Sequence, residues 1–276
     1  DFSPGSKLSL GIIVGSGKNV TYDGFHLDIM SEAGRYFCKD FGRVRFVQTV
    51  NDDNKKTVEE LKLLNFDALL WIHPTENREA VMWELQKSGL PTMCVNRIPH
   101  DKSLNFVSTD HYAAGKNAAE YLIKRGHEKS LFIGDSSANS YQDFLAGWLA
   151  GFSNFKHEFD ERLLINDHRQ IVDDINDLFR FKIDFTGCCV IGSEIWAAEK
   201  ALKNNCGNNF LERYKLLGYK VAVENYLKCA YLNIDPVRLG NKAAEALFAL
   251  AQGTLKEPVN IKICPEIIEP GCEPQR

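Results

Sequence analysis

The sequence predicts an α/β protein in which parallel sheets are covered by helices on both faces. Three observations support this class. β-like and helical segments alternate along nearly the whole chain, the β-like segments are short apolar runs, and one stretch has the pattern of a complete strand–helix–strand unit. Continuous apolar strands are typical of parallel sheets buried on both faces. With 276 residues, 44% of them hydrophobic, the chain can form two domains or one large α/β domain.

The strand–helix–strand unit runs from Asn105 to Asp135. Phe106 and Val107 favour a strand, and Asp110 stands where a helix N-cap belongs. The apolar residues that follow recur at helical spacing and predict one packed face: Ala113, Ala114, Ala118, Ala119, Leu122 and Ile123. Gly126 is expected to end this helix as its C′ residue, and residues 131–133 to form a short buried strand. This is the pattern of one crossover unit of a parallel sheet.

The other elements follow from the same apolar periodicities and from turn residues such as Gly89 and Gly253. Before the unit, strands are expected at Leu8–Val14, Val44–Val50, Asp67–Ile72 and Pro91–Val95, and helices at Asp23–Asp40, Lys55–Leu64 and Glu76–Ser88. After it, strands are expected at Leu163–Ile165, Cys188–Ile191, Tyr214–Tyr219, Cys229–Asn233 and Val259–Cys264. Helices are expected at Ser140–Phe155, His168–Phe181, Glu194–Asn205 and from Pro236, a first helical residue, to Gln252.

Composition and charge exclude several classes of function. A net charge of −4 argues against a nucleic-acid surface on this chain. No apolar run reaches the roughly 20 residues of a membrane helix, and the polar start, DFSPGSK, is no signal peptide. Because the first residue is Asp, we expect a fragment, a processed product or a trimmed chain. The eight cysteines form no CxxC pair and no zinc spacing, which favours free buried thiols in a reducing cytoplasm.

No catalytic motif is evident. The Gly-Ser-Gly at 15–17 follows a strand but lacks the third glycine of a dinucleotide fingerprint, and no Walker lysine motif, GxSxG elbow or HExxH occurs. Asp52 and Asp53 are adjacent and typical of a turn. We therefore expect a protein that is not an enzyme and that uses no cofactor and no metal.

The motifs of the strand–helix–strand unit resemble the effector-binding domain of LacI/GalR transcriptional regulators. They are Asp110, Gly115, Leu122, Ile123, Gly126, His127 and Gly134. Further segments resemble the same family in the same order, over about residues 8 to 272: LGIIVGSGKNVTYDGF, FDALLWIHP, LPTMCVNRIP, LAGWLAGF, LLGYKVA, LNIDPVRLGNKAAEALFAL and CPEIIEPGC. His127 has a structural alternative, in which it caps the helix or bonds a nearby carbonyl.

The resemblance implies a periplasmic-binding-protein-like fold of type I. Two similar Rossmann-like subdomains would be joined by three crossover strands, with a ligand cleft between them at the carboxyl ends of the strands. The N-terminal subdomain would comprise residues 8–108 and 235–262, and the C-terminal subdomain residues 109–234 and 263–276. Residues 1–7 would be the remnant of a linker that follows a helix-turn-helix headpiece absent from this chain.

The resemblance also implies the ligand-binding residues, which are expected just after strands: Asn19, Thr21, Tyr22, Asn96, Arg97, Gln142, Ser193, Glu194, Trp196 and Lys220. Three of them have a structural alternative: Arg97 could form a surface ion pair, Glu194 could favour a helix N-terminus, and Trp196 could be core or rim. His73 is expected to be a turn residue, with a place at the rim of the cleft as the alternative. Asn96, Gln142 and Lys220 depart from the family's usual Asp, Arg and Asp.

The resemblance implies the effector-binding and dimerisation domain of a cytoplasmic bacterial regulator. Its partners would be a small effector, a second copy of the chain, and DNA only through the missing N-terminal domain; no membrane partner is expected. Arg97 and Lys220 against Glu194 suggest a mildly positive cleft, which favours an acidic effector such as a sugar acid or sugar phosphate; a neutral sugar is the alternative. A periplasmic sugar-binding protein of a transporter is the alternative function, and the scattered cysteines and the Gly126–His127 motif argue against it.

Overall fold

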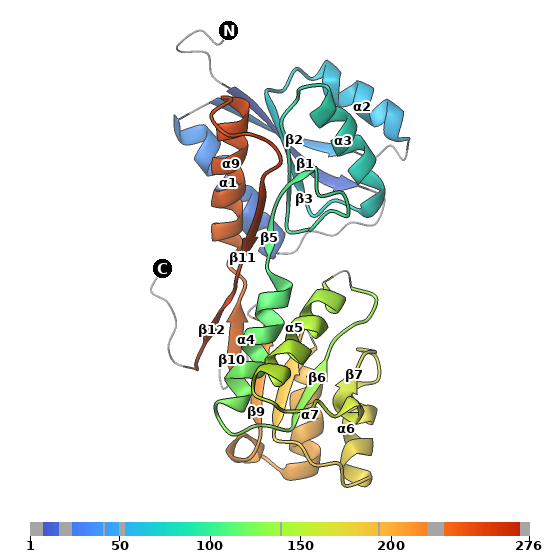
Figure 1. The fold of residues 1–276 in the computed structure, drawn as a ribbon. Coiled ribbons are helices and arrows are strands. Elements are labelled where there is room, and N and C mark those ends of the chain that lie inside the picture. The colour runs from blue at the N-terminus through green and yellow to red at the C-terminus, as the bar shows by residue number, and fades with distance from the viewer. Residues whose placement is uncertain are drawn as a thin grey trace. The chain divides into compact units, whose positions relative to one another are not determined.

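The computed structural model describes residues 8–16, 24–40, 42–49, 53–138, 140–192, 194–219 and 229–270. The chain forms two compact units (Figure 1). Unit 1 comprises Asp1–Thr109 and Asp235–Ile263, and unit 2 comprises Asp110–Ile234 and Cys264–Arg276. Two of the three boundaries lie one residue after the expected positions, and the third, between residues 234 and 235, coincides with its expected position.

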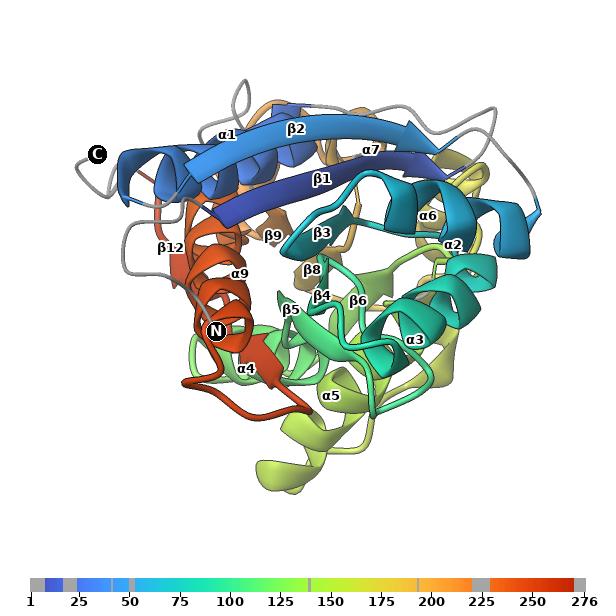
Figure 2. The same cartoon turned by 90° about the horizontal axis from the view of Figure 1, so that it is seen from above.

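Unit 1 contains a parallel sheet with strand order β11-β5-β4-β3-β1-β2. The strands are β1 (Leu8–Ser16), β2 (Gly42–Thr49), β3 (Ala68–Ile72), β4 (Thr92–Val95), β5 (Asn105–Thr109) and β11 (Asn260–Ile263). The helices are α1 (Gly24–Asp40), α2 (Asn54–Leu63), α3 (Glu79–Lys87), preceded by the 3₁₀ turn η1 (Glu76–Arg78), and α9 (Pro236–Ala251). Figure 2 shows α1 and α9 on one face of this sheet and α2 and α3 on the other. The central strands β3 and β4 are buried throughout, as continuous apolar strands predict.

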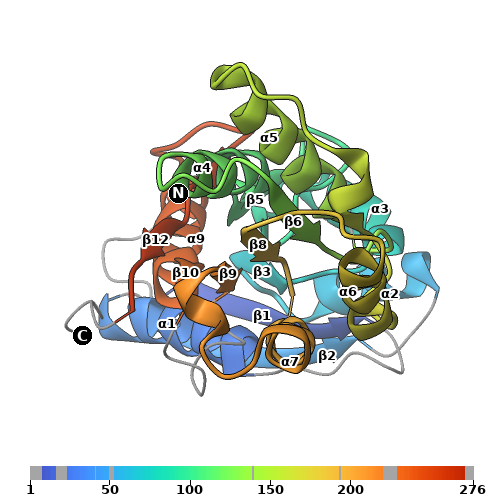
Figure 3. The same cartoon turned by 90° about the horizontal axis from the view of Figure 1, so that it is seen from below.

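Unit 2 repeats this architecture with strand order β12-β10-β9-β8-β6-β7. The strands are β6 (Ser130–Ile133), β7 (Leu164–Ile165), β8 (Gly187–Val190), β9 (Lys215–Tyr219), β10 (Ala230–Asn233) and β12 (Glu266–Ile268). The helices are α4 (His111–Ile123), α5 (Tyr141–Asn154), α6 (Ile171–Arg180) and α7 (Ile195–Cys206), with 3₁₀ turns η2 (Glu161–Leu163) and η3 (Phe210–Glu212). Figure 3 shows α4 and α5 on one face and α6 and α7 on the other, and a separate apolar cluster lies beneath each pair.

The predicted class of parallel sheets covered on both faces is confirmed, with one correction. The last predicted strand, Val259–Cys264, corresponds to β11, but a further strand, β12, follows it. β12 is antiparallel to β10, with Tyr231 opposite Ile268, so the edge of this sheet is not parallel. Three residues directly after a proline carry too weak a periodicity to be recognised as a strand.

The predicted capping signals of α4 are confirmed. The Asp110 carboxylate accepts the backbone N–H of Ala113 at 3.0 Å. Gly126 has φ +85°, its N–H bonds to the carbonyl of Ile123 at 2.9 Å, and the N–H of His127 bonds to the carbonyl of Leu122 at 3.0 Å. This pair of bonds is a Schellman motif, with Gly126 at C′. The His127 ring was expected to cap the helix or bond a nearby carbonyl, but its Nδ1 lies 3.1 Å from the Thr186 hydroxyl oxygen instead. Burial lowers the pKa of this imidazole.

The cysteines were predicted to be free and buried. All seven within the described residues are free, and four of them, Cys94, Cys188, Cys189 and Cys229, are buried. Cys206 is half-buried, while Cys38 and Cys264 are exposed, which corrects the prediction for these two. Burial raises the pKa of each of the four buried thiols, so they are held in the neutral form.

Candidate functional site

Two left-handed residues stand at the carboxyl ends of adjacent strands in unit 1. His73, after β3, has φ 44°, and Asn96, after β4, has φ 62°. Each still extends the sheet by one bond, His73 N–H to Val95 O and Asn96 N–H to Val107 O, both at 2.9 Å. The chain then turns sharply out of the sheet. Non-glycine residues in this conformation are uncommon and concentrate at functional sites.

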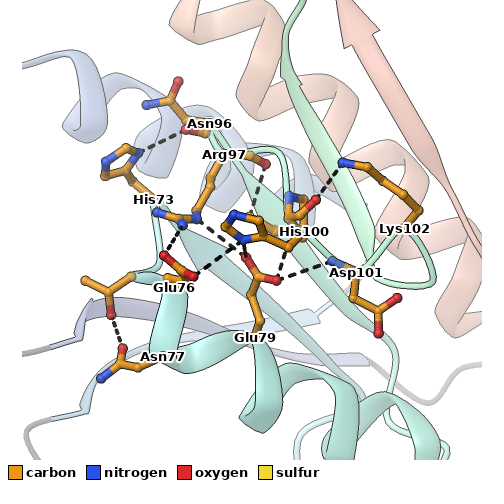
Figure 4. Close-up of polar contacts among 12 residues, drawn as sticks. His73, Glu76, Asn77, Glu79, Asn96, Arg97, His100, Asp101 and Lys102 are labelled. Atoms are coloured by element: carbon orange, nitrogen blue, oxygen red, sulfur yellow. Dashed lines mark hydrogen bonds and ion pairs between the residues drawn. The ribbon is translucent and has the colours of Figure 1, made fainter. Parts of the chain in front are cut away.

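The two turns are tied to each other. Nδ1 of His73 lies 2.9 Å from the carbonyl oxygen of Asn96 (Figure 4), and the His73 ring lies 5.4 Å from the ring of His26 at the start of α1. The prediction that His73 is a turn residue is thus confirmed, and its ring also positions the turn that presents Asn96. No sequence signal pointed to His26.

Arg97 follows Asn96 and is buried, with 8% of its surface exposed. Its Nε lies 3.8 Å from Glu79 and its Nη2 4.0 Å from Glu76, both distances being ion-pair separations longer than hydrogen bonds (Figure 4). Nε finds no hydrogen-bond acceptor among the described residues. The arginine is therefore not the surface ion pair considered from sequence: it is a buried cation with two carboxylates near it and unused N–H capacity.

Glu79 is the more fixed of these carboxylates. It opens α3, and its side chain is 13% exposed. It accepts the backbone N–H of His100 at 3.0 Å and that of Asp101 at 3.4 Å, and His100 Nδ1 lies 3.3 Å away. Glu76, in contrast, is 70% exposed. Among the described residues, the Arg97 guanidinium thus has two carboxylates beside it and adds no net positive charge of its own to this group.

The carboxyl edge of the sheet in unit 2 carries a second polar group. Asp135 follows β6, and its Oδ2 lies 3.0 Å from Nδ1 of His168, which follows β7. Asp135 also accepts the N–H of Ser137 at 2.9 Å and its hydroxyl at 2.7 Å. These hydrogen bonds, followed by the charge of His168, lower the pKa of the Asp135 carboxyl. Sequence reasoning missed both residues, although Asp135 comes two residues after β6 and His168 three residues after β7.

Three predicted residues stand on helices at this edge of unit 2. Gln142 is exposed in the first turn of α5. Glu194 is the N-cap residue of α7 but forms no side-chain bond to the first-turn amides, and its carboxylate lies over Gly192, where an added Cβ would be 2.5 Å from Oε2. Its negative charge stands at the N-terminus of α7, as the alternative prediction for Glu194 expects. Trp196 is 50% exposed, so it is not a core residue.

Asn19, Thr21, Tyr22, Ser193 and Lys220 lie outside the described residues. Of the predicted set, Asn96 and Arg97 lie together in unit 1, while in unit 2 Gln142 lies on α5, Trp196 on α7 and Glu194 at the N-cap of α7. Over the described part of the chain, no three His, Cys, Asp or Glu side chains are grouped to hold a metal ion. A search of the same part found no helix long and apolar enough to cross a membrane.

Residues 8–195 match the family described as periplasmic binding proteins and sugar binding domain of LacI family. The catabolite control protein A of Staphylococcus xylosus is 26% identical over 129 residues, which cover 45% of this chain and 39% of that protein. The matched part thus spans about two fifths of this curated relative.

Solved structures are similar over nearly the whole chain. A regulatory protein of the LacI family from Chloroflexus aggregans is 16% identical, with a TM-score of 0.79, covering 96% of this chain and 98% of that chain. The Escherichia coli transcriptional repressor ascG is 17% identical, with a TM-score of 0.76, covering 97% and 99%. These similarities show that the chain has the fold of type I periplasmic binding proteins.

Proposed function

The chain belongs to the family of periplasmic binding proteins and sugar-binding domains of LacI regulators, and from this premise we propose that it is the effector-binding and dimerisation part of a bacterial transcriptional regulator. In this proposal it senses a small sugar or sugar-derived ligand and acts by binding, without catalysis. DNA would be bound by a separate N-terminal helix-turn-helix. The effector would act by binding one of two states of the domain more tightly than the other, because a ligand with equal affinity for both states leaves their populations unchanged.

One observation carries the assignment of the site: polar side chains follow the strands of both sheets at their carboxyl ends. In unit 1 they are Asn96 and Arg97, presented by the left-handed turn at Asn96, and in unit 2 they are Asp135, His168 and Gln142. Open α/β sheets bind ligands beyond the carboxyl ends of their strands. Amide, carboxylate and guanidinium groups supply the donors and acceptors that sugar hydroxyls need. We also retain Glu194 and Trp196, together with Asn19, Thr21, Tyr22, Ser193 and Lys220, as proposed ligand contacts.

The charges around Arg97 favour a neutral sugar over a sugar acid or sugar phosphate. An acidic effector would have to displace or compete with Glu76 and Glu79, which already lie 4.0 Å and 3.8 Å from the guanidinium. A neutral sugar hydroxyl, in contrast, can accept from one N–H of the guanidinium or donate to Glu76 or Glu79, and leaves both carboxylates in place. The sequence favoured an acidic effector from the charges of Arg97 and Lys220 against Glu194, a count that did not include Glu76 and Glu79; Lys220 lies outside the described residues.

Calorimetric titration with matched pairs of neutral sugars and their uronic acids tests this proposal. The best neutral sugar should bind at least about tenfold more tightly than its acid, a difference of about 1.4 kcal/mol. Glu79→Gln should reduce the ratio of the affinity for the neutral sugar to that for its acid, because this change leaves Arg97 with one fewer carboxylate beside it. Glu60→Gln, an exposed change on α2, should leave the ratio unchanged. Tighter binding of the acid by the wild-type protein would overturn the neutral assignment, and binding of no sugar would count against the sensor itself.

Oligomeric state separates the regulator from a transporter-linked binding protein. We propose a homodimer, since regulators of this kind pair across a two-fold axis, and a cytoplasmic location, since the seven described cysteines are free. Light scattering at tens of micromolar should give twice the mass of the 31.2 kDa chain. A monomer at that concentration would favour the transporter-linked class.

A further inference from the structure

A cavity of about 540 Å³ opens at the other edge of the sheet in unit 1, where its strands begin. It is lined by Ser9, Arg43, Arg45, Leu64 and Asn65. Ser9 is the second residue of β1 and pairs with Arg43 in β2, while Leu64 and Asn65 form the turn that leads into β3. The cavity thus lies at the amino ends of the strands, whereas the residues proposed for the effector follow their carboxyl ends. A ligand here would be independent of the proposed function.

The two arginines line this cavity from one strand. Arg43 and Arg45 are two residues apart in β2, so their side chains leave the same face. The Arg45 guanidinium donates to the carbonyl of Leu64 and lies 4.3 Å from the centre of the Phe66 ring, which holds it in place. This contact leaves further N–H groups of Arg45 for a ligand, because a guanidinium carries five.

Neither arginine forms an ion pair with a carboxylate among the described residues. Arg162 and Arg169, by contrast, pair with an aspartate two residues away at 2.6 Å and 2.8 Å. The carboxylate of Asp67 is close to this edge, but it accepts the backbone N–H of Ser9 at 2.7 Å and does not line the cavity. The cavity therefore contains two positive charges that the described part of the chain does not neutralise.

The other lining groups suit an anion with an organic body. Asn65, held in a left-handed turn with φ 50°, and Ser9 bring an amide and a hydroxyl, and Leu64 adds apolar surface. The volume lies within the range of small-molecule sites and far exceeds that of a bare ion. Two guanidinium forks match the charge of about −1.5 to −2 and the terminal oxygens of a phosphate group. We propose that this cavity binds a small organic phosphate.

The test is a titration followed in ¹⁵N-TROSY spectra, with phosphate exchanged for chloride at constant ionic strength. Inorganic phosphate should shift the amides of Ser9, Arg45 and Asn65 saturably in the millimolar range. Phenyl phosphate should bind more tightly than inorganic phosphate, because Leu64 adds an apolar contact, and phenol should not bind. Absence of saturable shifts at these amides up to about 50 mM phosphate would refute the proposal of a phosphate site. Binding of phenyl phosphate that is no tighter than that of inorganic phosphate would refute the proposal that the ligand carries an organic group.

Arg43→Gln is the decisive variant, because the Arg43 side chain forms no hydrogen bond or ion pair with the described residues, while Arg45 also donates to the carbonyl of Leu64. It should weaken phosphate binding about tenfold, as the loss of one charge-assisted contact predicts. Arg180→Gln is the matched control, since Arg180 is exposed on α6 in unit 2. An equal affinity in wild type and Arg43→Gln would refute the assignment. No sugar enters this experiment, so its failure leaves the effector proposal untouched.

Discussion

Gly147 of α5 lies so close to α4 that no methyl group fits between them. A Cβ atom at this position would lie 1.9 Å from the carbonyl oxygen of Tyr112 and 2.8 Å from its carbonyl carbon. Both are backbone atoms, which cannot rotate away as the end of a side chain could. To reach 3.0 Å, below which such contacts are essentially never observed, the two helices must separate by about 1.1 Å. Gly147→Ala therefore forces a shift of the backbone.

The net effect on stability combines two opposing contributions. Replacing glycine by alanine inside a helix favours folding by about 1 kcal/mol. Overpacking costs about 1–3 kcal/mol, and we expect the upper end because backbone must move. The same separation would loosen the Trp148 ring, whose centre lies 5.4 Å from that of Phe132 beneath it. We expect Gly147→Ala to lower the free energy of unfolding by about 2 kcal/mol.

The matched control is Gly34→Ala in α1. A Cβ atom at Gly34 meets no atom within 4 Å, so only the helix-propensity gain remains, and this variant should be more stable by about 0.5–1 kcal/mol. Urea unfolding followed by circular dichroism measures both variants. Amide hydrogen exchange should show faster opening of α4 and α5 in Gly147→Ala alone, which localises the loss even if the two units unfold separately. An equal gain in both variants would show that the helices are not packed this closely.

Three further predictions concern stability. Asp110→Ala should cost about 1 kcal/mol by removing the bond to the N–H of Ala113, and Asp110→Asn should restore most of it, as measured by urea unfolding. Burial acts to raise the pKa of Glu269, but hydrogen bonds from Tyr121 and from neighbouring cations lower this pKa overall. The stabilisation that Glu269 contributes is therefore present above the ordinary pKa of a glutamate and is lost as pH falls through the lowered pKa. Glu269→Gln should therefore flatten the acid limb of a stability–pH curve, and an unchanged limb would refute this role. Asn105→Ala should cost about 2–3 kcal/mol in thermal unfolding, because its buried amide joins the starts of β4, β5 and β11.

The local elements could be predicted from sequence because each carries its own signal. The helix α4 is the clearest case: Asp110 supplies a capping oxygen, the alanines define a packed face, and Gly126 takes the left-handed conformation that ends it. These effects act within a few residues, so sequence alone displays them. β12 lacked such a signal, since its three residues are defined by pairing with β10, more than thirty residues earlier in the chain.

The candidate site was predictable only in outline, because a strand end identifies which residues follow it but not which residues meet them. The rule that ligands bind beyond the carboxyl ends of parallel strands placed Asn96 and Arg97 at that edge of the sheet. Applied to the ends of β6 and β7 as well, the same rule would have found Asp135 and His168. It could not reveal that Asp135 and His168, thirty-three residues apart in sequence, lie 3.0 Å apart. Such pairs depend on two neighbouring strands ending at the same level, which is a property of the sheet rather than of either segment.

Arg97 shows why the charge of a site cannot be obtained by adding up the residues at strand ends. Its compensating carboxylates, Glu76 and Glu79, belong to the preceding 3₁₀ turn and helix, and the fold brings them to 4.0 Å and 3.8 Å from the guanidinium. Counted alone, Arg97 favours an acidic ligand, but counted with these neighbours it favours hydroxyl groups. Removing one carboxylate tests this difference: Glu76→Gln takes away the exposed partner 4.0 Å from the guanidinium. If the local charge governs selectivity, affinity for a uronic acid measured by calorimetry should rise relative to its neutral sugar in this variant; an unchanged ratio of the two affinities would contradict the electrostatic argument.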